Sequence, residues 1–507
     1  MKKRQEILRS YANIIHYTGL ILVLAGILML SPLLCLFFYP EELAQLWGFA
    51  TPAIVIISLG AMAWLLFRSR NGQSLDIQQS AVIVVLSWVT VCLFSAWPFM
   101  AMQNLNFTQA IFESVSGWTT TGLSVVNVEQ SSHLILLWRS IMQWAGGAGL
   151  AIIMLATIVG PAGPALGIAE GRSQQLVPQV RHSAKIVMMI YAGYAAVGII
   201  AYNLAGMDIF DAINHTFAAI STGGFSTKTD SIGHWNSLSI EAVTLPLMIL
   251  GNLNFLTAYL LLHGKIKAAS KSGEVRLMLL LIPVCAVALF FLVCTSLYPA
   301  LSKSVRVAVF ETVTALTTTG FSTVSYGNWN SFGVLLIIVL MLIGGGTCST
   351  AGGIKQYRIY VLYKSFVWEI KSFFLPRNAV TENYIWQGEQ KDFISEARIR
   401  QIGTFVFLYL ATYAVGSLII ASTGISLKES LFEFASALGT VGLSVGVTGP
   451  QASPVILWTE IFGMLLGRLE FFVIITGVIK ILRDFFRGTL LRQIAPLVML
   501  QLELDIS

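Results

Sequence analysis

Four short segments of this chain carry threonine and glycine at a spacing that suits the coordination of a cation by backbone carbonyl groups. Each segment places a glycine ten residues after its first residue, and a bulky apolar residue and a serine follow that glycine. The segments are 112–125, 214–227, 310–323 and 432–445. The corresponding glycines are Gly122, Gly224, Gly320 and Gly442. Because glycine adopts backbone angles that a side chain resists, the carbonyl oxygens of such a segment can point to one side and replace the hydration shell of an ion.

The residues just before each glycine complete the candidate cation site. A single segment of this kind would more simply be a surface turn. Four copies between hydrophobic stretches favour a pore lining, because irregular backbone at membrane depth needs cover from protein or water. A short helix before each segment would also direct the partially negative end of its dipole at the cation. The predicted filter residues are Thr120, Thr121, Gly122, Thr222, Gly223, Gly224, Thr318, Thr319, Gly320, Thr440, Val441 and Gly442.

The hydrophobic stretches on both sides of each segment are the elements that must position it. One stretch precedes each segment, at 81–102, 186–204, 277–297 and 402–422. Another follows each segment, at 134–159, 240–262, 332–361 and 454–481. Two further stretches come before the first unit, at 15–38 and 47–67. The sequence therefore predicts an all-α polytopic membrane protein with ten spanning and four half-spanning helices, in which four helix–pore loop–helix repeats surround one pore with fourfold pseudo-symmetry.

The same stretches divide the chain into consecutive parts. The predicted parts are an N-terminal pair of transmembrane helices (1–75), pore repeats one to three (76–170, 171–270 and 271–367), a polar cytoplasmic linker (368–399), pore repeat four (400–490) and a cytoplasmic C-terminal tail (491–507).

Composition and charge exclude a soluble protein. Hydrophobic residues make up 56% of the 507 residues and charged residues 11%, whereas a soluble protein carries about a quarter charged residues. Of the 31 Lys and Arg residues, 25 fall in the six segments 1–10, 67–73, 171–185, 264–276, 355–400 and 480–492. All six lie on one side of the membrane if the N-terminus does, and the positive-inside rule assigns that side to the cytoplasm. We expect both termini to be cytoplasmic and the basic loops to be topology signals, not nucleic-acid surfaces.

No pattern typical of an enzyme occurs in the sequence. The five cysteines lie in apolar stretches without a CxxC pair, and the six histidines show no metal-binding or catalytic spacing. A membrane-embedded enzyme would need paired carboxylates, metal ligands or a nucleophile beside a base at the midplane. We therefore predict no catalytic residues, no cofactor in this chain, and an ion as the substrate.

A second glycine-rich run lies inside the hydrophobic stretch that follows the third segment. It does not fit a phosphate-binding loop, because Lys355 is not followed by Ser or Thr and no strand precedes the run. So many glycines must break a helix, and broken backbone at this depth needs a cavity. The run contains Gly344, Gly345, Gly346, Thr347, Cys348, Ser349, Thr350, Ala351, Gly352 and Gly353.

Arg468 and Arg139 lie within hydrophobic stretches, where a charge is costly and indicates a function. Arg468 falls level with Gly346 when the repeats are aligned. One interpretation is that its side chain faces the pathway and repels cations. The other is a structural ion pair with Glu470 or Glu460, and one side chain can have both roles. Arg139 is predicted to be a structural anchor nearer the outer face.

Carboxylates recur near the predicted start of three pore helices. They are Glu113, Glu311 and Glu433, and His215 takes the fourth place. Stabilisation of a helix N-terminus is the favoured interpretation, because a negative charge is favourable there. The alternative is that these carboxylates attract cations at the outer mouth.

The chain resembles the Trk/Ktr/HKT superfamily of potassium transporters, and within it most closely the bacterial TrkH-type membrane subunits. The resemblance covers nearly the whole chain. It rests on the four filter segments, the glycine-rich break, the two extra N-terminal helices and the run Gly467-Arg468-Leu469-Glu470. It implies potassium as the ion, since family members that prefer sodium often carry serine at the position of Gly122. No segment reads Thr-Val-Gly-Tyr-Gly as in tetrameric potassium channels, which implies looser discrimination against sodium or rubidium.

The resemblance also implies how the pathway is controlled and assembled. The run 344–353 would be an intramembrane gate below the filter, with Arg468 as a second gating residue. Expected partners are a second copy of the chain, in a homodimer, and a cytosolic ring of nucleotide-binding regulatory subunits, in a bacterial cytoplasmic (inner) membrane. The alternative function is that of a sodium-selective or sodium–potassium symporting relative.

Overall fold

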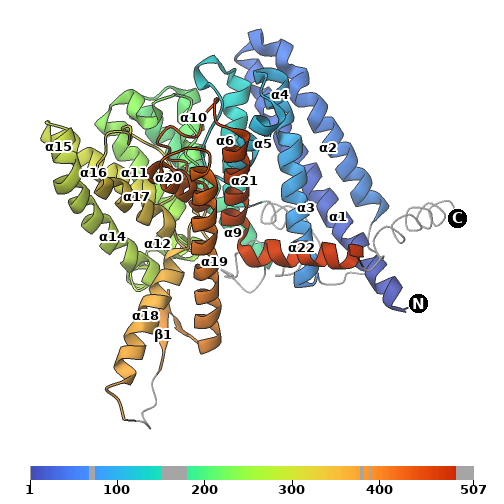
Figure 1. Cartoon of the computed structure of the whole chain (residues 1–507). Helices are drawn as coiled ribbons and strands as arrows, with labels where there is room; N and C mark the ends of the chain where they lie inside the picture. The colour runs from blue at the N-terminus through green and yellow to red at the C-terminus, as the bar shows by residue number, and fades with distance from the viewer. Residues whose placement is uncertain (1, 68–74, 150–179, 377–381, 389, 487–507) are drawn as a thin grey trace.

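The computed structural model describes residues 2–67, 75–149, 180–376, 382–388 and 390–486, and almost all of its regular structure is helical. Long helices stand side by side and run between the upper and lower ends of the molecule (Figure 1). Six of the described helices are long and apolar enough to cross a membrane, at Ser10–Phe37, Pro40–Leu66, Ile77–Gln103, His182–Leu204, Gly273–Leu297 and Glu396–Ala421. The predicted C-terminal tail (491–507) lies outside the described residues.

The first two long helices form a closely packed pair. Helix α1 (Lys2–Leu30) continues into a 3₁₀ turn (Ser31–Phe37), and α2 is Leu46–Leu66. The helices touch where Gly19 and Gly60 face each other, since a Cβ atom on either glycine would lie 2.6 Å from the carbonyl oxygen of the other. The pair occupies one side of the molecule, next to α3 (Ile77–Ser95) and α4 (Trp97–Gln103), as Figure 1 shows.

A long helix, a short buried helix and a further helix then follow one another several times along the chain. The short buried helices are α5 (Phe107–Trp118), α10 (Ile209–Ile220), α16 (Leu301–Leu316) and α20 (Leu427–Gly439). The long helices that precede the last three are α9 (Val180–Leu204), α14 (Gly273–Leu289) and α19 (Glu396–Ala421). The helices that come after the short ones are α6 (His133–Ala148), α11 (Leu238–Asn252), α17 (Ser331–Ile343) and α21 (Pro454–Leu469).

Polar side chains start three of the short helices. Asn106 and Gln109 form a reciprocal capping box at α5, while Asp208 and Ser426 accept backbone N–H bonds at the start of α10 and α20. These caps satisfy N–H groups that have no partner within the helix. The capped ends lie at the surface of the molecule, and the helices run from there into its buried interior.

Three of the four hydrophobic stretches that follow the filter segments are broken within the described residues. In that part of the chain six helices, or seven if one bent pair is counted as a span, are long and apolar enough to cross a membrane, fewer than the ten predicted. Helix α11 bends by 117° into α12 (Phe255–Leu262), α17 stops before α18 (Gln356–Ser372), and α21 stops at Glu470 before α22 (Phe471–Phe486). Helix α22 runs across the molecule beneath α21 (Figure 1). Hydropathy alone does not register such breaks, because both halves of a broken span are apolar.

Glycines near these breaks bring the helices against the ends of the short buried helices. A Cβ atom on Gly146, Gly251 or Gly467 would overlap the carbonyl oxygen of Trp118, Ile220 or Leu438, respectively. Small residues here allow backbone-to-backbone approach, as they do between membrane helices in general.

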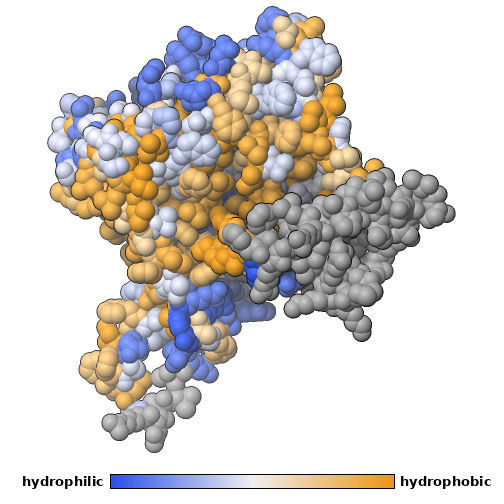
Figure 2. All heavy atoms as spheres, turned by 45° about the vertical axis from the view of Figure 1, so that its right-hand side comes forward, coloured by the Kyte–Doolittle hydropathy of each residue, from blue (hydrophilic) through white to orange (hydrophobic). Residues whose placement is uncertain are grey.

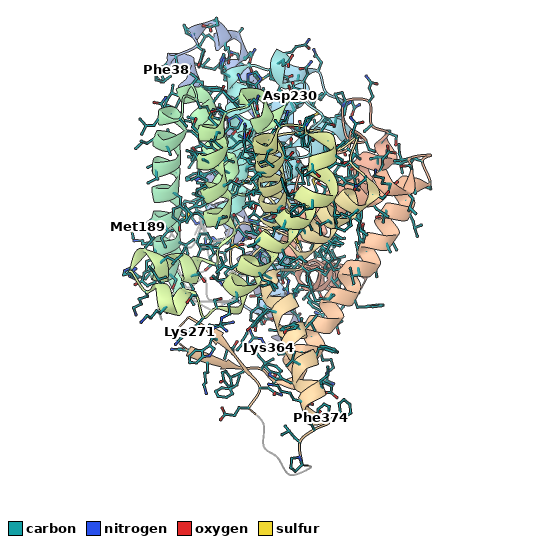
Figure 3. All side chains as sticks on the ribbon, turned by 90° about the vertical axis from the view of Figure 1, so that its left-hand side faces the viewer. Phe38, Met189, Asp230, Lys271, Lys364 and Phe374 are labelled. Atoms are coloured by element: carbon teal, nitrogen blue, oxygen red, sulfur yellow. The ribbon has the colours of Figure 1, made fainter. Side chains whose placement is uncertain are left out.

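The surface of the molecule has an apolar middle and polar ends. Leu280, Phe291 and Phe407 are more than half exposed, and Figure 2 shows hydrophobic side chains across the middle of one face, with hydrophilic ones at the top. Below this band lie Lys271 and Lys364, as labelled in Figure 3. The lower lobe combines α18 with a hairpin of β1 (Tyr384–Gln387) and β2 (Gln390–Phe393), in which Tyr384 pairs with Phe393. The short α13 (Ile266–Ala269) and α15 (Thr295–Leu297) complete the helices.

Candidate ion-binding site

The four short buried helices end in the same hydrogen-bonded turn. In α5 the N–H of Thr121 donates to the carbonyl of Ser116 at 2.9 Å, and the N–H of Thr120 donates to Gly117 at 3.1 Å. This is the Schellman arrangement, which satisfies the last carbonyl groups of a helix. The equivalent longer-range pairs are Gly223 to Ala218, Thr319 to Thr314 and Val441 to Ser436.

A threonine takes the left-handed position of each turn, where glycine is the usual residue. The φ angles are +56° at Thr120, +51° at Thr222, +52° at Thr318 and +50° at Thr440. A β-branched residue at such an angle is a strong outlier, and strained backbone of this kind clusters at functional sites. The sequence analysis attributed the special backbone angles to the glycines alone. The threonines gave no signal of this role, since threonine is common in extended segments.

The glycines two residues later close into a ring. Each has a positive φ, from +74° to +100°, and each lies against the carbonyl oxygen of the next segment. A Cβ atom would overlap that oxygen at every position. The contacts run from Gly122 to Gly223, from Gly224 to Thr319, from Gly320 to Val441, and from Gly442 back to Thr121. The structure thus brings the four glycines selected from the sequence into one closed circuit.

One side of this ring opens into a cavity of about 1200 Å³. All four ring glycines line it, together with the serine that follows each of them two residues later. Asp230 and Glu129 also lie on its wall, and Asp230 marks the upper end of the molecule in Figure 3. A polar cavity of this size admits hydrated ions to the ring.

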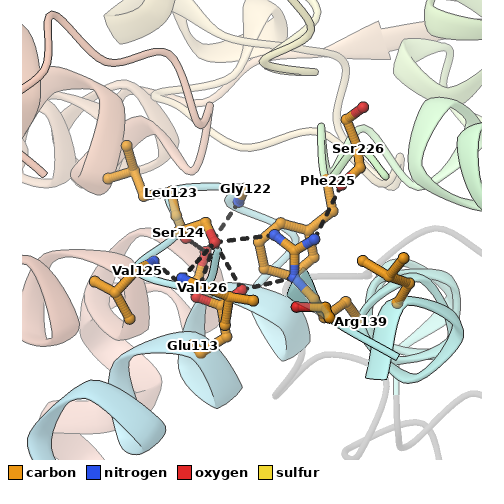
Figure 4. A network of polar contacts seen from close by, with 12 residues as sticks. Glu113, Gly122, Leu123, Ser124, Val125, Val126, Arg139, Phe225 and Ser226 are labelled. Carbon is orange, nitrogen blue, oxygen red and sulfur yellow. Dashed lines mark hydrogen bonds and ion pairs between the residues drawn. The ribbon is translucent and has the colours of Figure 1, made fainter. Parts of the chain in front are cut away.

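A buried ion pair holds the first segment in place (Figure 4). The Glu113 carboxylate accepts bonds from Arg139 Nε at 2.7 Å and from the N–H of Val125 at 3.0 Å. Arg139 donates onward to the carbonyl of Ser226, at 3.0 Å, and its guanidinium lies 3.9 Å from the ring centroid of Phe225. Arg139 therefore ties the first segment to the second, in agreement with its predicted role as an anchor.

Buried side chains at the same position hold the other three segments. Glu311 accepts the N–H of Thr323 at 2.9 Å, Glu433 accepts the N–H of Val445 at 2.9 Å, and His215 lies 2.8 Å from the Ser226 hydroxyl. All four side chains are fully buried, and they lie at or beyond the middle of their helices and not in the first turn. Both sequence interpretations of the glutamates were therefore wrong. They are neither at the helix N-termini nor at the mouth, because the chain folds back after the ring and brings its N–H groups to them.

The opposite side of the ring is covered by the glycine-rich run 344–353, which is not helical. The N–H of Gly352 donates to the Thr318 hydroxyl at 2.8 Å, and the Thr350 hydroxyl lies 3.2 Å from that of Thr222. A Cβ atom on Gly352 would overlap the Thr440 hydroxyl. The run thus contacts the left-handed threonines of three segments from the side away from the cavity.

Arg468 reaches this run from α21. It donates to the carbonyl of Thr350 at 2.9 Å and to the carbonyls of Gly146 and Gly147 at the end of α6. The Glu470 carboxylate pairs instead with Arg358, at 2.8 Å, and Glu460 bonds to Thr448. The two predicted partners are therefore engaged elsewhere. Glu470 has a φ of +62° and follows the last residue of α21, so its carboxylate reaches Arg358 and not Arg468, two residues earlier.

Two residues that the sequence analysis missed also hold these segments. Gln143 bonds to both the carbonyl of Gly223 and the N–H of Phe225, and Glu274 accepts the N–H of Thr347 at 2.7 Å. For Gln143 the available signal was a polar side chain within an apolar stretch, which is costly unless it is paired. Glu274 lies in the basic segment 264–276 and gave no such signal.

Comparisons with known proteins agree with this architecture. Residues 48–486 match the family model TrkH, described as cation transport protein. The Trk system potassium uptake protein TrkH of Escherichia coli (strain K12) is 31% identical over 482 residues, which cover 92% of this chain and 98% of that protein. The Trk system potassium uptake protein TrkG of the same strain is 28% identical over 479 residues, which cover 91% and 96%. The crystal structure of the potassium transporter TrkH from Vibrio parahaemolyticus superposes with a TM-score of 0.81 at 28% identity, and the match covers 93% of this chain and 98% of that one.

Proposed function

The chain belongs to the TrkH family of cation transport proteins, and from that premise we propose that it conducts potassium ions across the bacterial cytoplasmic membrane through the ring of four glycines. The ion would be held by the carbonyl groups of the twelve filter residues, which four pseudo-symmetric repeats bring to one axis. The N-terminal helix pair α1 and α2 stands outside these repeats. Potassium is transported in this proposal and is not a resident cofactor.

The observation that carries the proposal is the closed circuit of glycine-to-carbonyl contacts beside the polar cavity. Carbonyl oxygens that converge from four strands can replace the water around a potassium ion. The left-handed threonines fix where each strand leaves its helix, so the carbonyl positions depend on backbone geometry more than on side chains.

The run 344–353 is the proposed gate, and Arg468 is the side chain that holds it closed. Its contacts with three of the four threonines support this role, because an ion that passes the ring from the cavity would meet the run next. Opening then requires the run to leave these threonines. Arg468 can prevent that movement by its bonds to Thr350 and to the end of α6.

The lower end of the molecule would face the cytoplasm. The N-terminal end of α1 lies in the lower half of the molecule, on the opposite side from the lobe of α18 and the hairpin (Figure 1), and the positive-inside rule supports this orientation. A cytosolic ring of nucleotide-binding subunits would dock on this end, and the membrane subunit would form a homodimer.

Ion selectivity in reconstituted vesicles tests the proposal. We expect uptake of radioactive rubidium driven by an outward potassium gradient, with inhibition by external potassium at lower concentrations than by sodium. Vesicles without protein are the control. Equal inhibition by sodium, or uptake that needs sodium, would favour the sodium-selective or symporting alternative.

A further inference from the structure

Two buried carboxyl groups meet on one threonine behind the fourth filter strand. The Thr448 hydroxyl oxygen lies 2.9 Å from Oε2 of Glu433 and 2.8 Å from Oε1 of Glu460. Both glutamate side chains are fully buried, and Thr448 is 9% exposed. The second oxygen of Glu460, Oε2, is buried and has no hydrogen-bond partner among the described residues.

A count of hydrogen atoms shows that this arrangement needs one more proton. A hydroxyl group donates one hydrogen, and an ionised carboxylate donates none. If Thr448 donates to Glu433, its contact with Glu460 is a hydrogen bond only when Glu460 donates. If Thr448 donates to Glu460, the same holds for Glu433.

The surroundings place that proton on Glu460. Oε1 of Glu433 accepts the N–H groups of Val445 and Val447, at 2.9 and 3.1 Å, and the hydroxyl of Ser444. These donors suit a negative charge. Glu460 has no such donors among the described residues, and an ionised carboxylate there would be buried without compensation. We propose that Glu460 is a proton-binding site, and that its O–H donates to Thr448, which in turn donates to ionised Glu433.

The first repeat carries an arginine where the fourth repeat carries the proposed proton-binding glutamate. Glu113 occupies the position of Glu433, and its charge is balanced by Arg139, which lies 17 residues after Gly122. Glu460 lies 18 residues after Gly442, at nearly the same place on the equivalent helix. The first strand is thus fixed by a permanent cation, and the fourth strand by a proton that can leave.

Loss of the Glu460 proton would weaken the interactions that hold the fourth filter strand. Within the described residues, Glu433 is the charged group that acts on Glu460. The other helices that pack against α21, which are α5, α19 and α22, add none. Deprotonation would put a second negative charge on Glu460. The two carboxylates would then be no farther apart than the summed lengths of their two hydrogen bonds to Thr448. Since like charges repel strongly in a buried site, the Glu433 side chain would loosen its hold on the N–H groups of Val445 and Val447.

Infrared spectroscopy of the full-length chain in lipid vesicles tests for the proton without any reference to transport. At neutral pH we expect a carboxylic-acid C=O band that is present in the unmodified protein and lost in Glu460→Gln. Glu129→Gln, at the exposed mouth, should keep the band. Thr448→Val should keep the band but shift it, because the acid loses its acceptor. A spectrum in which Glu460→Gln removes no acid band overturns the proposal.

Rubidium flux tests the effect on the strand, and this part rests on the proposed potassium conduction. We expect the preference for rubidium over sodium to fall several-fold as the pH is raised in the unmodified protein, but to stay constant in Glu460→Gln, whose amide donates as the acid does. A preference with the same pH dependence in both proteins overturns the link to the filter. An infrared band without any rubidium flux would count against potassium conduction alone and leave the proton site standing.

Discussion

The two sides of the glycine ring are held by different kinds of interaction. On the cavity side, buried charged groups anchor the strands, and the Glu113–Arg139 pair is the strongest case. On the other side, the glycine-rich run has neutral hydrogen bonds to threonine hydroxyls and close backbone contact. The charged groups that bond to the run, Arg468 and Glu274, contact its neutral backbone and Thr347 there and not an opposite charge. A buried ion pair is very costly to break, whereas a neutral hydrogen bond contributes only about 0.5–1.5 kcal/mol. The comparison indicates that the anchored strands on the cavity side form a rigid outer frame. The glycine-rich run 344–353 forms an inner plug that can move.

The largest expected effect is on the rigid side. Arg139→Leu leaves Glu113 buried without its cation, and we expect the free energy of unfolding to fall by about 3–5 kcal/mol. Thermal unfolding of the purified protein measures this. Arg306→Leu, which removes a more exposed pair with Glu241, is the matched control and should cost less. If Arg139→Leu cost no more than this control, the outer frame would not depend on buried charge.

The next effect concerns the plug. Removal of three or four residues from 345–349 should raise rubidium flux through the isolated subunit by at least about tenfold, because a shorter run cannot reach the threonines, and tenfold corresponds to about 1.4 kcal/mol. A shortened hairpin at 387–390 is the control for loop deletion in general. Lower flux in folded, inserted protein would make the run a structural support for the filter.

A smaller change is expected at the ring itself. Gly122→Ser would force its side chain against the carbonyl of Gly223 at φ +100°, so the carbonyl must move and the coordination field must change. We expect sodium permeability to rise several-fold relative to potassium in vesicle flux assays. Gly446→Ser, also at positive φ but in open space, controls for backbone strain alone. If both variants had the same sodium-to-potassium permeability ratio, Gly122 would not be a filter residue.

The smallest effect is expected for Arg468→Ala. It removes the bonds from α21 to Thr350 and to the end of α6, so basal flux should rise, by up to about tenfold for the loss of one or two bonds to a charged group. Ion preference should stay the same, because the filter carbonyls keep their positions. Rubidium flux with and without competing sodium measures both quantities. Flux at or below the unmodified level in folded protein would leave Arg468 with a structural role only.

Local patterns in the sequence were sufficient to predict elements of the fold and part of the candidate site. The recurrence of a glycine followed by an apolar residue and a serine selected the four residues that the structure brings into one ring. The composition predicted a membrane protein, and the density of glycine predicted the break at 344–353. Each of these signals depends on residues that are close together in the chain, where propensity and hydropathy apply.

Only the tertiary structure decided which side chains hold these segments. Glu113 and Arg139 are 26 residues apart, Gln143 and Gly223 are 80 apart, and Arg468 and Thr350 are 118 apart. The sequence offered Glu470 as a partner for Arg468 because it lies only two residues away, but the positive φ at Glu470 turns that carboxylate to Arg358. The left-handed threonines and the breaks after α11 and α21 were missed for the same reason. Strain and breaks of this kind persist only when surrounding contacts overdetermine them, and those contacts come from distant parts of the chain.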